Sequence, residues 1–136
     1  MRMNESAENY LETILVLQKR NGNVRSIDIA HELSFSKPSV SVAMKNFREK
    51  GYITINDSGN ISLTDEGLKI AEYVYERHQV IATALMALGV DKETAFEDSC
   101  KIEHDISDKS FKKIKEYLDK NSSPSSRSGD IDVVLL

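Results

Sequence analysis

The sequence has almost no cysteine and no long apolar segment, and each absence excludes a class of protein. The single cysteine, Cys100, cannot form an intramolecular disulfide, so it is a buried filler, a reactive thiol or a metal ligand. No apolar run approaches the ~20 residues that a membrane-spanning helix needs. The first five residues also lack the apolar segment of a signal peptide, which predicts a cytoplasmic protein.

The chain also lacks the overall positive charge typical of nucleic-acid-binding proteins. Its formal net charge is −4, but this charge is unevenly distributed. Between Lys19 and Tyr52 there are seven Lys or Arg residues and three acidic residues, so this segment carries +4 and the remainder carries −8. A basic module on an acidic body can bind phosphates through one face and hold cations elsewhere.

Apolar spacing and turn residues predict a helix-turn-helix in the N-terminal half. A first helix is expected over residues 7–20, and a short one over 27–33 with Ser26 as its N-cap. After a tight turn, a third helix is expected over 37–50 with Ser36 as its N-cap. Two alternating segments, 52–56 and 61–64, then predict a β-hairpin, which completes the order of a winged helix-turn-helix.

The rest of the chain predicts further helices and a tail. An amphipathic helix is expected over residues 65–88, and Gly89-Val90-Asp91 separates it from helices over 92–105 and 108–119. The apolar stripe of the first of these helices fits a core, a dimer interface or both. The fold class is therefore mostly α, with a winged helix-turn-helix over 1–64, a helical domain over 65–120 and a disordered Ser- and Pro-containing tail over 121–136.

The predicted third helix supplies most of the candidate DNA-binding residues, because this helix of the motif enters the major groove with its N-terminal end toward the bases. Hydroxyl and basic side chains can hold phosphates, whereas Pro38 and Val42 offer apolar contact, for example to a thymine methyl group. A protein-interaction module is the alternative, but element order, spacing and local charge favour DNA. The candidates are Arg25, Ser36, Lys37, Pro38, Ser39, Ser41, Val42, Lys45 and Arg48.

A cluster of metal-ligating residue types lies near the end of the predicted helix over 92–105. Cys100, Glu103 and His104 are spaced i, i+3 and i+4, which places them on one face if the helix continues through them. His78 and Glu12 lie in two other predicted helices. These features alone also fit a solvent-facing Glu-His pair, a core-filling cysteine and a satisfied core histidine.

The chain resembles the diphtheria toxin repressor and manganese transport regulator (DtxR/MntR) family over about residues 4–117. The stretch around Cys100 is the most specific, whereas the helix-turn-helix stretches occur in many regulators. The matching stretches are Ala7-Glu-Asn-Tyr-Leu-Glu12, Asp28-Ile-Ala-His-Glu-Leu33, Lys37-Pro-Ser-Val-Ser41, Leu63-Thr-Asp-Glu-Gly67, Glu76-Arg-His78 and Asp98-Ser-Cys-Lys-Ile-Glu-His104.

The resemblance implies a homodimeric, metal-dependent repressor that binds palindromic operator DNA and controls metal uptake genes. Residues 65–120 would then form a dimerisation and metal-binding domain. His78, Glu103 and His104 match ligands of both branches of the family. Cys100 matches a position that is cysteine in the iron-responsive branch and glutamate in the manganese branch, and Glu12 matches a manganese-branch ligand.

Three positions depart from the family pattern. Asn9 stands where manganese regulators have Asp and the iron repressor has Met, so it offers an uncharged amide oxygen as a ligand. Ala82 and Phe96 replace the Glu and His of a second site in iron repressors, so that site is not expected. The SH3-like domain of longer members is not expected in these 136 residues. Because thiolate favours softer ions, Cys100 favours Fe²⁺, with Mn²⁺ as the alternative and Zn²⁺ or Co²⁺ able to bind in vitro.

A competing hypothesis is a metal-independent winged-helix regulator that responds to oxidation of Cys100. It predicts DNA binding that is insensitive to a chelator but altered by peroxide. An enzyme is not expected, because no candidate base or substrate pocket accompanies the metal-ligating residues.

Overall fold

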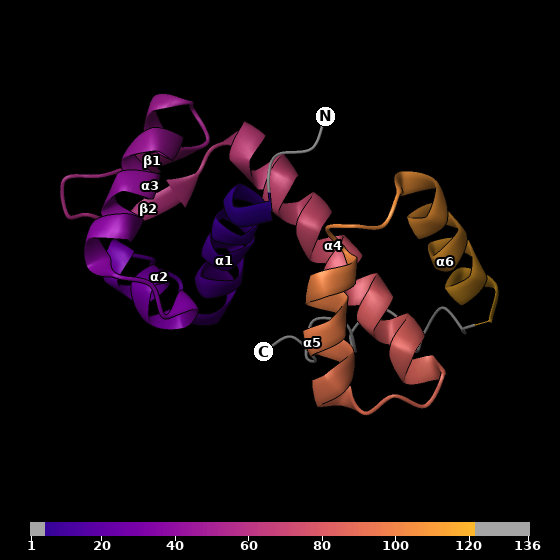
Figure 1. The fold of residues 1–136 in the computed structure, drawn as a ribbon. Helices are drawn as coiled ribbons and strands as arrows, with labels where there is room; N and C mark the ends of the chain where they lie inside the picture. Colours follow the sequence, from indigo (N-terminus) through magenta and orange to yellow (C-terminus); the bar gives the residue numbers. More distant parts are fainter. Residues whose placement is uncertain (1–4, 122–136) are drawn as a thin grey trace. The chain divides into compact units, whose positions relative to one another are not determined.

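The computed structural model describes residues 5–121, which form six helices and a two-stranded antiparallel hairpin (Figure 1). This order confirms the predicted mostly α fold, a winged helix-turn-helix followed by helices. Packing divides the chain within α4 into two compact units, the first ending at Val74 and the second beginning at Tyr75. The elements are α1 (Glu5–Asn21), α2 (Ser26–Leu33), α3 (Lys37–Glu49), β1 (Ile53–Ile55), β2 (Ile61–Leu63), α4 (Asp65–Ala87), α5 (Lys92–Ile102) and α6 (Asp108–Asn121).

The first unit packs its helices and hairpin around one apolar core. Tyr10 of α1 makes edge-on contacts with the rings of Phe35 and Phe47, with 5.7 Å between ring centroids in each pair. Burying one large apolar side chain stabilises a fold by roughly 1.5–3 kcal/mol. The spacing of the apolar residues therefore determines which face of each helix points inward. The fully buried members of the core include Leu11, Ile14, Ile29, Val40, Met44, Ile53 and Ile61.

Capping interactions set where α2 and α3 begin. Ser36 is the N-cap of α3, as predicted, and its Oγ accepts a hydrogen bond from the Ser39 backbone N–H at 3.3 Å. The prediction that Ser26 caps α2 is wrong, because Arg25 occupies that position and Ser26 is the first helical residue. The backbone N–H of Arg25 donates to the Asp28 carboxylate at 2.9 Å. With Arg25 as the cap, α2 begins one residue earlier than it would with Ser26 as the cap.

The hairpin is joined closely to the start of α4. Ile53 pairs with Leu63 and Ile55 with Ile61, in antiparallel register. The Thr64 hydroxyl accepts from the Gly67 backbone N–H at 3.2 Å, which makes Thr64 the N-cap of α4. A Cβ on Gly67 would lie 2.0 Å from the Tyr52 carbonyl oxygen, so only glycine allows this approach.

The second unit contains the later part of α4 together with α5 and α6. Its core is formed by Val80, Ile81, Phe111 and Leu118. Asp91 caps α5, and the hydrogen bond from the Thr94 backbone N–H lowers the pKa of its carboxyl group. No helix among the described residues is long and apolar enough to cross a membrane.

Helix α5 ends at Ile102, earlier than the predicted end at residue 105. Glu103 is the C-cap of α5 and keeps helical backbone angles, with its N–H bonded to the Ser99 carbonyl at 3.0 Å, so Cys100 and Glu103 keep the predicted helical spacing. His104 lies in the turn that follows. The Asp105 backbone N–H donates to the Ile102 carbonyl at 3.0 Å, a short-range bond that tightens the chain into a turn. The tail predicted over 121–136 lies outside the described residues apart from Asn121, the last residue of α6.

Candidate metal site and DNA-binding surface

Three residues predicted as metal ligands lie together in the second unit. His78 comes from α4, Cys100 from α5 and Glu103 from the first position after α5. One ligand atom from each lies within 4.8 Å of the others, and the three side chains range from half-buried to fully buried. A thiolate, an imidazole and a carboxylate at this separation can coordinate one divalent ion.

Glu103 is the most buried member of this group, with no exposed surface. An ionised carboxylate in the protein interior is costly unless a positive charge or hydrogen-bond donors compensate it. His104 Nε2 lies 3.3 Å from Glu103 Oε1, and the His104 side chain is itself 5% exposed. His104 is therefore adjacent to the three-residue group without being one of its members.

The backbone of α5 holds the ring of His78. His78 Nε2 lies 3.2 Å from the carbonyl oxygen of Phe96, and the rings of these two residues are 5.5 Å apart. A proton on Nε2 makes this contact a hydrogen bond, and a histidine that ligates a metal usually donates its other ring N–H to a carbonyl or carboxylate in this way. In the sequence, Phe96 stands out only as a replacement for a ligand of the second site in iron repressors. In the structure its backbone carbonyl orients the ring of His78.

The other two predicted ligands lie in the first unit. Asn9 and Glu12 are one helical turn apart on α1, where Glu12 is buried and Asn9 is half-buried. Their role as ligands stays a prediction.

The predicted DNA-binding residues are all exposed and belong to the first unit. Val40, Met44 and Phe47 form the buried face of α3, so the intervening residues point to solvent. Val42 is 61% exposed, so its side chain is accessible for contact with another apolar group. The residues of this candidate DNA-binding surface are Arg25, Ser36, Lys37, Pro38, Ser39, Ser41, Val42, Lys45 and Arg48.

Arg25 lies beside the hairpin. A Cβ added to Gly59 would lie 3.2 Å from Arg25 Nη2, so the guanidinium group lies against the hairpin turn. This contact places a positive charge beside the wing of the motif. A guanidinium in that position can bind a DNA phosphate.

Comparison with known families identifies both units. The N-terminal DNA-binding domain of the iron dependent repressors matches residues 2–59, and the metal binding and dimerisation domain of the same family matches residues 64–126. The chain belongs to the iron dependent repressor family. This confirms the resemblance found in the sequence, and the family consists of metal-dependent transcriptional regulators and not of enzymes.

Related proteins cover most of this repressor. An uncharacterised HTH-type transcriptional regulator of Methanocaldococcus jannaschii is 31% identical over 120 residues, which are 87% of this chain and 96% of the relative. The transcriptional regulator MntR of Escherichia coli O157:H7 is 32% identical over 117 residues, which are 86% of this chain and 76% of MntR. The structure of the manganese regulator SloR matches with a TM-score of 0.71 and 27% identity, over 88% of this repressor and 55% of SloR. The repressor thus spans about half the length of that solved chain.

A residue that the sequence reasoning missed is Arg77, which directly precedes His78 on α4. It is fully buried, and its guanidinium group donates to the main chain of the turn that carries Glu103. A charged residue within the apolar face of a helix was the available signal, since buried arginine is rare unless it is paired. Two of its partners are the backbone carbonyls of Glu103 and Ile106, which no sequence pattern identifies.

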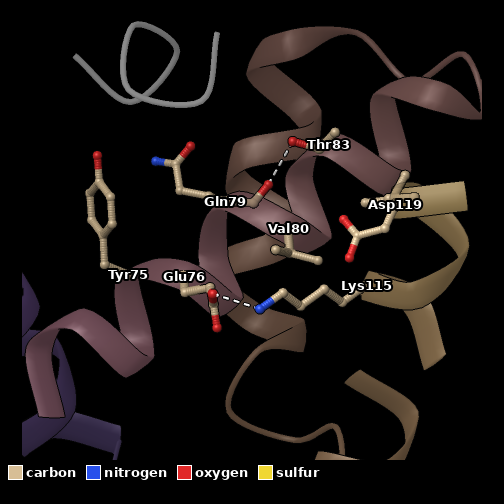
Figure 2. Close-up of a pocket in the computed structure, with 8 residues that line it drawn as sticks. Tyr75, Glu76, Gln79, Val80, Thr83, Lys115 and Asp119 are labelled. Atoms are coloured by element: carbon tan, nitrogen blue, oxygen red, sulfur yellow. Dashed lines mark hydrogen bonds and ion pairs between the residues drawn. The ribbon is translucent and has the colours of Figure 1, made fainter. Parts of the chain in front are cut away.

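The second unit also contains a cavity of about 220 Å³ between α4 and α6 (Figure 2). Val80 and Leu118 are among its apolar lining residues, and Glu76 and Lys115 also line it and form an ion pair with 2.9 Å between Oε2 and Nζ. None of the predicted metal ligands lines this cavity. It is therefore separate from the candidate metal site.

Proposed function

We propose that the chain is a cytoplasmic, homodimeric repressor that binds a palindromic operator when it holds Fe²⁺ or Mn²⁺, and that it controls metal uptake genes. The observation that carries this proposal is the group of His78, Cys100 and Glu103, whose ligand atoms lie within 4.8 Å of one another. This group lies in the segment that matches the family's metal binding and dimerisation domain.

The residues present fit a divalent ion. Glu103 has a fully buried carboxylate, Cys100 supplies a thiol that ionises on metal binding, and His78 supplies an imidazole nitrogen. A bound ion supplies positive charge beside the Glu103 carboxylate and joins α4 to the segment that follows α5. Asn9, Glu12 and His104 are proposed to complete the ligand set, as the family resemblance implies.

The choice between iron and manganese depends on two opposing observations. The Cys100 thiolate favours Fe²⁺, because sulfur ligands bind softer ions better than they bind Mn²⁺. The related structure of a manganese regulator favours Mn²⁺. Zn²⁺ and Co²⁺ are expected to bind in vitro, since both accept imidazole and thiolate ligands.

Metal control of DNA binding requires that the two sites be coupled. In a homodimer, two α3 helices held about one DNA turn apart match the half-sites of a palindromic operator. Ligands on α1 and on α4–α5 would let metal binding restrict how the first unit is held. A coupling of roughly 1–3 kcal/mol corresponds to about 5- to 150-fold tighter operator binding.

The proposal is tested by an anaerobic titration of the protein against a pool of random duplexes, with chelator, Fe²⁺, Mn²⁺ or Zn²⁺. Salt is held constant because phosphate contacts make affinity steeply salt-dependent. Sequence-selective binding that tightens with Fe²⁺ or Mn²⁺ supports the proposal and ranks the two ions. Selective binding that ignores every metal contradicts it and directs attention to the oxidation state of Cys100.

A pair of glutamate variants makes the titration specific to the candidate site. Glu103→Gln removes the buried carboxylate and keeps its shape, whereas Glu97→Gln changes an exposed residue of the same segment. We expect Glu103→Gln to lose the metal response and Glu97→Gln to keep it. Equal responses in the two variants would contradict the assignment of the ligands.

A further inference from the structure

Arg77 links α4 to the whole segment between α5 and α6. Its Nε and Nη2 lie 3.3 and 3.0 Å from the Glu103 carbonyl oxygen, and Nη2 also donates to the Ile106 carbonyl at 2.7 Å. Nη1 lies 3.1 Å from Asp108 Oδ1, at the start of α6. The guanidinium carbon lies 4.8 Å from the centroid of the Phe111 ring. One side chain thus contacts the end of α5, the turn and the beginning of α6.

This arrangement has an electrostatic reason. The carbonyls of Glu103 and Ile106 follow the last residue of α5, near the negative end of the helix dipole, so a positive charge beside them is favourable. A guanidinium group offers several donors in a rigid plane, so it can hold two carbonyls and a carboxylate at once. Because Arg77 is fully buried, these bonds are not exchanged for bonds to water.

We propose that Arg77 is a positioning residue for the metal site. By fixing the main chain at Glu103 and Ile106 to α4, it holds the Glu103 carboxylate beside His78, the next residue along α4, before any ion binds. A preorganised site loses less ordering entropy on binding and therefore has higher affinity. This inference rests on the proposed metal-binding function.

A neighbouring ion pair offers a matched control. Glu76 directly precedes Arg77 and bonds Lys115 of α6, as Figure 2 shows, so it too connects α4 with α6. The side chains of Glu76 and Lys115 are both roughly half exposed. Lys115 lies well beyond the turn that carries Glu103, so breaking this pair tests the link between the two helices without disturbing the turn.

The test compares full-length Arg77→Lys and Glu76→Gln with the wild-type protein. Anaerobic calorimetry gives the dissociation constants for Mn²⁺ and Co²⁺, and thermal unfolding of the metal-free proteins gives their stability. We expect Arg77→Lys to weaken metal binding by about 10- to 100-fold, the effect typical of residues that support ligands, and Glu76→Gln to change it by less than about twofold. The Co²⁺ thiolate absorption band reports whether Cys100 still coordinates.

Each outcome decides between positioning and a merely structural role. A lower unfolding temperature of Arg77→Lys with unchanged metal affinity would overturn the positioning role alone. A wild-type protein that binds neither ion would overturn the proposed function and this inference together. If Arg77→Lys does not fold, Asp108→Asn decides, since it removes one anchor of the guanidinium at a mostly exposed carboxylate. Weakening of about threefold in that variant supports the proposal, and wild-type affinity refutes it.

Discussion

At the scale of single residues, Cys100 has the largest effect on the expected metal preference. Cys100→Ser keeps the size of the side chain but removes the thiolate, so we expect Fe²⁺ affinity to fall at least about tenfold, or about 1.4 kcal/mol, and Mn²⁺ affinity to fall less. Anaerobic competition with a chromogenic chelator measures both constants. At saturating metal the variant should bind operator DNA nearly as well as the wild type. An equal loss for both ions would point to a packing effect of the half-buried side chain.

A second single-residue prediction concerns Gly67, where a Cβ would lie 2.0 Å from the Tyr52 carbonyl oxygen. Because that oxygen belongs to the backbone, the start of α4 has to shift. We expect Gly67→Ala to destabilise the protein by about 1–3 kcal/mol, as overpacked sites do, measured by urea unfolding. Glu66→Ala is the control, since Glu66 is the exposed preceding residue. Equal stability of the two variants would show that the close approach costs nothing to relieve.

At the scale of secondary structure, the sequence predicts which elements form but not how each one ends. Apolar spacing is enough to place six helices and the hairpin, because burying one face decides their register. The end of α5 depends on Arg77, which bonds the carbonyls of Glu103 and Ile106 from a distant helix. Every residue has a backbone carbonyl, so the sequence does not show which carbonyls Arg77 bonds. Neither the end of α5 nor the turn that positions Glu103 could therefore be predicted. The residue types of the ligands, in contrast, were visible in the sequence.

Helix α3 carries a prediction that separates affinity from specificity. Lys45→Gln is expected to weaken binding to all DNA sequences alike and to lower the salt slope by about one, because it removes one phosphate contact. Val42→Ala is expected to change the base preference at one or two operator positions and to leave the slope unchanged. Binding measured at several salt concentrations on an operator and its single-base variants checks both. Lys69→Gln, at an exposed position of α4, is the control, and a loss as large as that of Lys45→Gln would contradict the assigned surface.

At the scale of the whole molecule, metal control of DNA binding requires that the effect of the bound ion extend to the first unit. His78, Cys100 and Glu103 all belong to the second unit, so an ion bound by them alone stabilises that unit directly. Metal at 100 times its dissociation constant adds about 2.7 kcal/mol to the state that binds it. If Asn9 and Glu12 also coordinate, part of this stabilisation extends to α1 and thereby to the unit that carries the DNA-binding surface.

Hydrogen exchange of the full chain measures how far this stabilisation extends. With Mn²⁺ or Fe²⁺ present, we expect slower amide exchange in α4 and α5 and also in α1, because ligands on all three helices join the bound state. Glu12→Gln should keep the protection of α4 and α5 and lose most of that in α1. Protection confined to α4 and α5 in the wild type would contradict Asn9 and Glu12 as ligands. Control of DNA binding would then have to pass through the continuous helix α4, which belongs to both units, or through dimerisation.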